Sequence, residues 1–350
     1  MSAAAYALTQ LRQNLPRRTI IAIVSVAFWI VATLVQTGSG GVIAIWTGAL
    51  FMLELIVLSS ATRTISIGAM ATIFCAGGFM FGLAVLGGDS LRLLVPDRGA
   101  LLRQFGVTIL EESLKLLPVL YYLWRGRKKD TWAMGMTDVV LLATACGAGF
   151  SLLEDAHILM HGDVNRLTWL PTTNILGAHM IASHAIWTGL AGATIGLALL
   201  LRSRGIIALP IAASGYCWAV LDHTQNNYRI SIRNFLATAL GAVTADGWMS
   251  VYLFVIAGMV AIAFDLYIIH GTLAKIPLKV SLTGGLDGLL SAWRFITNKR
   301  AFAFLAYQYR RTSGSARTEI ETIAREIAEE MIEEAKSSAT AGQSAQPVQA

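Results

Sequence analysis

Long apolar runs alternate with short polar connections along most of this chain. A helix that crosses a bilayer needs about 20 mostly apolar residues, and eight stretches meet that requirement. The candidate spans are roughly 20–36, 41–60, 65–87, 104–124, 137–156, 176–201, 206–226 and 249–270. The pattern therefore predicts an all-α fold, a polytopic transmembrane helix bundle of about eight spans within a transmembrane domain over residues 1–272.

Two further patterns follow the last candidate span. Between residues 283 and 311, aromatic side chains are interleaved with arginine and lysine, which is typical of a helix that lies on an anionic membrane surface. Residues 319–334 then show isoleucines at helical spacing beside many glutamates, a face too acidic to favour lipid. We expect cytoplasmic amphipathic helices over 273–336, and a protein partner for the acidic one.

The last residues, 337–350, are mostly Ser, Ala, Gln and Pro without periodicity. Such a composition cannot bury enough apolar surface to offset the entropy of ordering. We expect a disordered tail.

Composition supports the membrane interpretation. Hydrophobic residues make up 55% of the 350 residues and charged residues only 14%, which excludes an ordinary soluble domain. The net charge of +6 would suit nucleic acid, but the basic residues cluster between apolar runs, where they set topology. We expect a lipid bilayer and no nucleic acid as partner, and the distribution of basic residues over alternate connections predicts that both termini are cytoplasmic.

Charged groups inside spanning helices cost about 2.5–3.5 kcal/mol each on insertion scales and usually mark function. Here they fall on four consecutive candidate spans, and the alternating directions of those spans place them all toward the outer half of the bilayer. The polar residues are Glu111, Glu112, Lys115, Glu154, Asp155, His179, His184, Asp222 and His223. This layer is the candidate site.

Spacing within the fourth span adds chemistry. Lys115 follows Glu111 by four residues and Glu112 by three, so the three side chains share a helix face. Two neighbouring carboxylates cannot both ionise cheaply in a low dielectric, while Lys115 favours the charge of one of them. This arrangement is typical of a general base, although an intrahelical ion pair with no catalytic role would leave the same pattern.

Other polar and small residues are open to structural interpretations. His184 and His223 would also suit hydrogen bonds between helices. The run Gly189, Gly192 and Gly196 predicts close helix packing. Glu54 and Asp265 are acids within candidate spans for which the sequence offers no explanation.

Four short motifs together resemble the PrsW family of intramembrane proteases. They are Glu111-Glu112-x-x-Lys115, Phe150-x-x-x-Glu154, Ser183-His184-Ala185-Ile186-Trp187 before a glycine-rich stretch, and His223-x-x-x-Asn227. Their order and helix placement also match that family, which is related to the CAAX prenyl protease and bacteriocin-processing group. The resemblance covers about residues 104–230, the protease-like core. Two departures are Asp155, where the family usually has Asn, and the additional Asn226, which makes the partner of His223 ambiguous.

The resemblance implies that Glu111 or Glu112 activates a water, with Glu154 and His184 assisting. His223 and Asn227 would then stabilise the developing oxyanion. Lys115 and Phe150 would support the site.

The resemblance leaves metal dependence open. Glu111, Glu154, His184 and His223 could hold Zn²⁺ and leave a position for water. The related CAAX group instead implies a metal-free glutamate mechanism.

The function we expect is an intramembrane endopeptidase that hydrolyses a membrane-tethered protein, such as a regulator of the anti-sigma-factor type, in a bacterial cytoplasmic membrane. An ion-coupled transporter would also use buried acids and histidines, but the chain shows no inverted repeat. A non-enzymatic scaffold is the other alternative, and it has no need to keep all four motifs.

Overall fold

The computed structural model describes the apolar core of the chain and two helices near its C-terminus. The described residues are 24, 26–27, 30–31, 51–59, 62–94, 100–127, 134–160, 183–231, 235–273, 303–310 and 314–327. Most of the candidate span 20–36, the residues before 183 in the candidate span 176–201, and the tail 337–350 lie outside these residues.

The described residues form helices and short connections, with no strand among them. In chain order the principal helices are α3 (Ile67–Leu94), α4 (Ala100–Arg127), α5 (Met136–Met160), α7 (His184–Leu200), α8 (Ala208–Ser231), α9 (Phe235–Thr244) and α10 (Trp248–Leu273). The 3₁₀ turns η3 (Arg202–Ile207) and η4 (Ala245–Gly247) precede α8 and α10, and shorter helices cover 51–58, 303–310 and 315–327. The predicted all-α class is confirmed.

Four of the described helical segments are long and apolar enough to cross a membrane. They are Ile67–Leu91, Met136–Ile158, Gly205–Asn227 and Thr238–Ile269, and His184–Leu200 is a shorter apolar helix. Helices suit a bilayer because they satisfy every backbone hydrogen bond internally. The chain is thus a helical membrane protein, and the count of eight spans stays a prediction.

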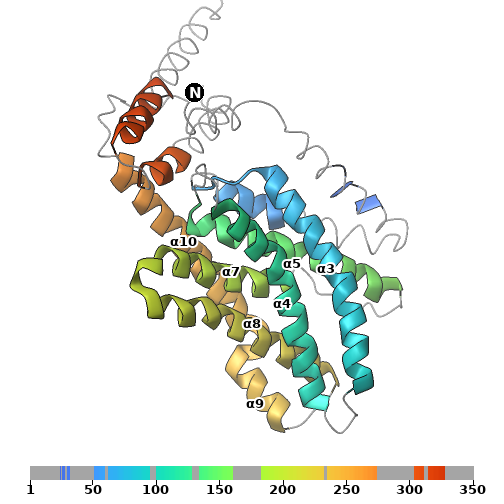
Figure 1. The fold of residues 1–350 in the computed structure, drawn as a ribbon. Helices are drawn as coiled ribbons and strands as arrows, with labels where there is room; N and C mark the ends of the chain where they lie inside the picture. The colour runs from blue at the N-terminus through green and yellow to red at the C-terminus, as the bar shows by residue number, and fades with distance from the viewer. Residues whose placement is uncertain are drawn as a thin grey trace, which may run out of the picture.

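Helix α5 is the centre of the bundle. In its apolar window 89% of the residues are buried, against 28% in that of α3 and 22% in that of Gly205–Asn227. Figure 1 shows α5 with α3 on one side and α7 on the other, and both pack extensively on it. Large apolar side chains on α3, α4 and α10 point outward, as expected for helices that face lipid.

Glycines let these helices approach backbone to backbone. A Cβ atom added at Gly147 of α5 would lie 2.2 Å from the carbonyl oxygen of His184, the first residue of α7. A Cβ at Gly192 would lie 2.3 Å from the Cβ of Ala143. The close packing predicted for the glycine run on α7 is therefore confirmed, and Gly147 brings His184 against α5.

Asp138, in the first turn of α5, anchors the connection that precedes α3. Its Oδ1 accepts hydrogen bonds from the backbone N–H groups of Thr64 (2.8 Å) and Ile65 (3.1 Å). Its Oδ2 accepts from the Thr64 hydroxyl (2.6 Å) and from the N–H of Gly135 (3.0 Å). This buried acid is fully bonded and structural.

Asp265 of α10, unexplained by the sequence, caps the N-terminus of α5. Its carboxylate accepts from the N–H groups of Met136 (3.1 Å) and Thr137 (2.7 Å), donors that no helical carbonyl can reach. The Tyr307 hydroxyl donates to the same carboxylate at 2.5 Å. Burial is the main cause that raises the pKa of Tyr307, and the charge of Asp265 adds to it. The phenol therefore stays protonated and is the donor. Glu54, the other acid that the sequence left unexplained, is exposed.

The helix at 303–310 corrects one expectation. Phe304 and Tyr307 form a buried cluster with Ile268 and Ile269 of α10, and Figure 1 shows this helix, in red, beside the end of α10. Its apolar face therefore meets protein, and the membrane-surface prediction is wrong for residues 303–310. The other residues of that prediction, 283–302 and 311, lie outside the described residues.

The acidic helix at 315–327 packs against its own chain, and a separate protein partner for it stays a prediction. Ile320 and Ile327 are buried. Tyr309 of the preceding helix donates to Glu321 at 3.1 Å, and the Arg317 guanidinium lies 4.6 Å from the centre of the Tyr309 ring. The two C-terminal helices are thereby joined.

Candidate active site

Helix α4 carries a buried ion pair in its middle. The Lys115 ammonium lies 2.5 Å from Oε1 of Glu112, one turn earlier, and both side chains are at most 1% exposed. The same ammonium lies 2.6 Å from Nδ1 of His184. Since an isolated buried charge is costly, the two opposite charges hold each other in place and connect α4 to α7.

His184 is the first residue of α7 and lies against α5. Its Nε2 makes a short hydrogen bond with Oε2 of Glu154. The ring of Phe150, one turn before Glu154, lies 4.8 Å from the His184 ring, and the Lys115 ammonium lies 4.9 Å from the same Phe150 ring. The predicted pair Phe150 and Glu154 therefore contacts His184 from one face of α5.

His223 of α8 faces the glutamates of α4. Its Nδ1 lies 2.8 Å from Oε1 of Glu112, and its Nε2 lies 3.1 Å from Nδ2 of Asn227. Asn227, one helical turn after His223, is thus the hydrogen-bond partner that the Asn226-Asn227 pair left ambiguous.

The three carboxylates of the site differ in exposure. The side chain of Glu112 is 1% exposed, that of Glu111 14% and that of Glu154 23%. Glu111 Oε2 lies 3.4 Å from Nε2 of His223 and has no hydrogen-bond partner in the described part of the chain. Glu111 and Glu154 therefore lie on the open side, and Glu112 lies at the bottom.

All eight predicted site residues converge between α4, α5, α7 and α8. We call this group the His–Glu cluster: Glu111, Glu112, Lys115, Phe150, Glu154, His184, His223 and Asn227. Asp155 is buried on α5 beside Glu154, and His179 lies outside the described residues.

Comparison with known proteins agrees with this geometry. A family model described as PrsW family intramembrane metalloprotease matches residues 42–263, which include the whole His–Glu cluster. The chain belongs to the PrsW family. No curated protein and no solved structure matches it. As a PrsW-family protein it is an intramembrane protease, and the match extends beyond residues 104–230 to α3 and most of α10.

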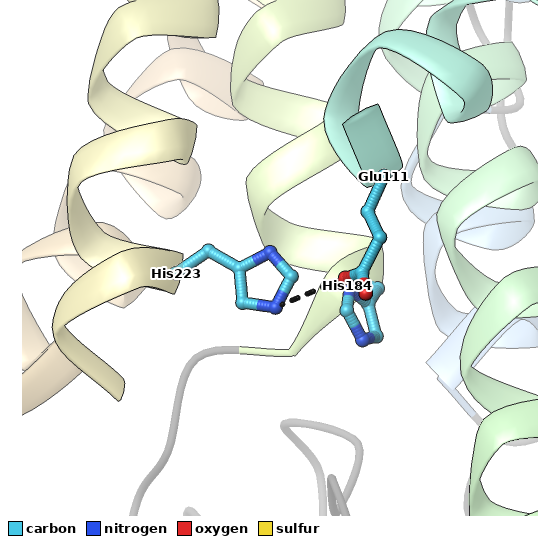
Figure 2. Close-up of side chains that lie close together, drawn as sticks. All are labelled: Glu111, His184 and His223. Atoms are coloured by element: carbon cyan, nitrogen blue, oxygen red, sulfur yellow. Dashed lines mark ion pairs between the residues drawn. The ribbon is translucent and has the colours of Figure 1, made fainter. Parts of the chain in front are cut away.

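The family is described as a metalloprotease, and three side chains of the site can hold a metal ion. Ligand atoms of Glu111, His184 and His223 lie within 4.8 Å of one another, and Figure 2 shows them converging from α4, α7 and α8. Glutamate oxygen and histidine nitrogen are zinc ligands, and the buried Glu111 Oε2 lacks a partner. Because Glu112 contacts Nδ1 of His223, the Nε2 of that ring is the nitrogen that faces Glu111.

Both histidines need a change of partner before they can bind a metal. Lys115 contacts Nδ1 of His184 and Glu154 its Nε2, and a neutral imidazole offers only one free lone pair. A cation at Nε2 of His184 would therefore displace Glu154 and require the Lys115 contact to loosen, and a cation at Nε2 of His223 would displace the Asn227 amide. With these changes the donor set fits a zinc ion.

Sequence reasoning assigned no role to two residues beside this PrsW site. Trp187 stacks on the His223 ring, with ring centres 4.3 Å apart and an angle of 16° between the planes. Its indole N–H donates to Asp222 at 2.8 Å. The available signal was position: Trp187 follows His184 by three residues, which places both on one helix face, and Asp222 directly precedes His223.

Proposed function

We propose that this PrsW-family protease hydrolyses a membrane-tethered protein with a water molecule that Glu154 activates, beside a zinc ion held by Glu111, His184 and His223. The observation that carries the proposal is the convergence of these ligand atoms from three helices around an unpartnered Glu111 oxygen. A bound zinc ion would supply a Lewis acid that polarises a carbonyl group and acidifies water.

The most buried members of the cluster orient the others. Glu112 accepts from Lys115 and contacts His223, while Lys115 also contacts His184. This ion pair holds His223 through Glu112, and it holds His184 until that ring binds a metal. Neither Glu112 nor Lys115 is free to take a proton from water. Glu112 is therefore a poor candidate for the general base.

Glu154 is the better base because it is the most exposed carboxylate of the cluster. It can take a proton from the attacking water and return it to the leaving amine, the two transfers that peptide hydrolysis requires. Asn227 can donate its amide N–H to the developing oxyanion.

The position of the site bears on the substrate. Glu154 is six residues before the end of α5, about 9 Å at 1.5 Å per residue. The prediction of cytoplasmic termini places this layer in the outer half of the bilayer. We propose a single-span substrate cut near the outer face, and a regulator such as an anti-sigma factor is the example that the family resemblance implies.

The test is cleavage of tagged single-span substrates in proteoliposomes by the wild type, Glu154→Gln and Glu111→Gln, with zinc content measured on each protein. Glu154→Gln should lower kcat by about 10²–10⁴-fold, the usual contribution of a general base, while zinc remains bound. Glu111→Gln should lose zinc and activity together. Chelation should inactivate the wild type, and added zinc should restore it.

Glu54→Gln is the matched control, since it makes the same replacement at an exposed acid on the helix at 51–58. It should cleave like the wild type. Cleavage that survives chelation but is lost in Glu111→Gln would overturn the zinc assignment and make Glu111 the base. Wild-type kcat in Glu154→Gln would refute the role given to Glu154.

A further inference from the structure

Trp187 forms one wall of the site. Its indole ring lies almost parallel to the His223 ring, at 4.3 Å and 16°, and nearly perpendicular to the His184 ring, at 5.2 Å and 78°. The side chain is 1% exposed. One aromatic residue of α7 therefore contacts both histidines.

The indole is itself held in position by a hydrogen-bond network across three helices. Its Nε1–H donates to Oδ2 of Asp222 on α8 at 2.8 Å. Ser250 of α10 donates to the same oxygen in a short hydrogen bond, and Trp218 of α8 donates to the Ser250 hydroxyl at 2.8 Å. Rotation of Trp187 in its plane would break the bond to Asp222.

Hydrogen bonds hold the edge of the His223 ring, and Trp187 covers its face. Glu112 and Asn227 bond the two ring nitrogens, at 2.8 Å and 3.1 Å. Small tilts of the ring about its Cβ–Cγ bond move these nitrogens little, so the two bonds oppose such tilts only weakly. A parallel aromatic face restricts the tilt, since offset-stacked rings have a preferred geometry.

We propose that Trp187 is a positioning residue whose stacked ring face sets the tilt of the His223 ring and so aims its Nε2 at the position shared with Glu111. The inference rests on the proposed function, in which His223 holds zinc. Trp187 acts through His223 and takes no part in proton transfer.

The decisive variants are Trp187→Leu, which removes the aromatic face, and Trp187→Phe, which keeps it and loses the N–H donor. Changing the group that orients a metal-binding histidine typically costs about 10–100-fold in metal affinity or activity. Trp187→Leu should therefore lower kcat and zinc affinity by about that factor, with KM nearly unchanged. Trp187→Phe should recover most of both.

Leu190→Ala is the control for simple loss of packing. Leu190 is buried on α7 one turn after Trp187 and belongs to the same apolar cluster. Its truncation should lower the thermal stability while kcat and zinc affinity per folded molecule stay at the wild-type values.

A folded Trp187→Leu protein with wild-type kcat and zinc affinity would overturn the proposal, because the indole would then be core packing only. Equal losses in Trp187→Leu and Trp187→Phe would also overturn it, since the stacked face would not be the cause. Failure of the proposed function is distinguishable: if Glu154→Gln cleaves like the wild type while Trp187→Leu still loses zinc affinity, the positioning role stands and the base assignment falls.

Discussion

Two buried polar clusters lie near opposite ends of α5 and differ in how their carboxylates are bonded. The capping cluster, Asp138 and Asp265, receives backbone N–H and hydroxyl donors on all four carboxylate oxygens. On α5 the His–Glu cluster includes Glu154, which is 16 residues after Asp138 and so about 24 Å along the helix. It bonds titratable side chains to one another and leaves Glu111 Oε2 without a hydrogen bond.

The difference separates a structural acid from a functional one. Buried polar groups are normally satisfied, so an unpartnered oxygen requires an explanation. In the capping cluster, hydrogen bonds to backbone N–H and hydroxyl groups offset the cost of burying the carboxylates. The unpartnered oxygen of Glu111 faces a histidine and lies on the open side of its cluster. A charged residue within a span thus suggests a function, and its hydrogen-bond partners show whether its role is structural or functional.

Lys115→Met should have the largest effect on stability and should also inactivate the protein. It leaves the Glu112 carboxylate buried without its cation, and breaking a buried pair in this way costs about 3–5 kcal/mol. The measurements are thermal unfolding in detergent and cleavage of a single-span substrate.

The double variant Glu112→Gln with Lys115→Met separates these two losses. Removing both charges should restore much of the stability, because no uncompensated ion remains. Activity should stay low, since His223 loses its Glu112 contact and His184 its Lys115 contact. A double variant as unstable as the single one would contradict the ion pair as the cause.

Asp265→Ala should have the opposite signature, with a loss of stability and no loss of kcat per folded molecule. It removes the acceptor of Met136 N–H, Thr137 N–H and the Tyr307 hydroxyl, and we expect a cost of about 2–3 kcal/mol in the free energy of unfolding. Unfolding and cleavage measured on the same preparation test this. A fall in kcat comparable to that of Glu154→Gln would remove the distinction between the clusters.

Tyr307→Phe should have the smallest effect. The ring stays packed against Ile268 and Ile269, and only the hydrogen bond to Asp265 is lost, so about 1 kcal/mol is expected. Phe304→Ala in the same helix removes apolar contacts instead and should cost more. Equal stability of Tyr307→Phe and the wild type would show that this bond contributes nothing to docking of the 303–310 helix.

Much of the fold was predictable because lipid imposes a simple rule. Apolar length predicted the helices found as α3, α4, α5, α8 and α10 to within several residues. Helix α7 begins only at His184, and α9 was not predicted. The 303–310 helix was assigned to the membrane surface because the sequence pattern of an apolar helix face is the same whether that face contacts lipid or protein.

The candidate site was predictable as a set of residues but not as a set of roles. In the sequence, Glu111, Glu112 and Glu154 are all glutamates within candidate spans, and nothing there distinguishes their roles. Only their surroundings separate them, since Lys115 and His223 contact Glu112 while Glu154 stays the most exposed of the three. Trp187 was visible in a motif, but its stacking on His223 depends on a contact between two helices.

The sequence by itself determined the helical membrane class, the layer in which the charged residues lie and the motifs that mark a PrsW-family protease. Those properties follow from local rules: apolar length, helical spacing and the cost of charge in lipid. The tertiary structure decided that Glu112 is bonded to Lys115 and His223 while Glu111 Oε2 has no hydrogen bond, that Asn227 contacts His223, and that Asp265 caps α5. Each of these joins residues far apart in the chain, and close packing at positions such as Gly147 brings them into contact.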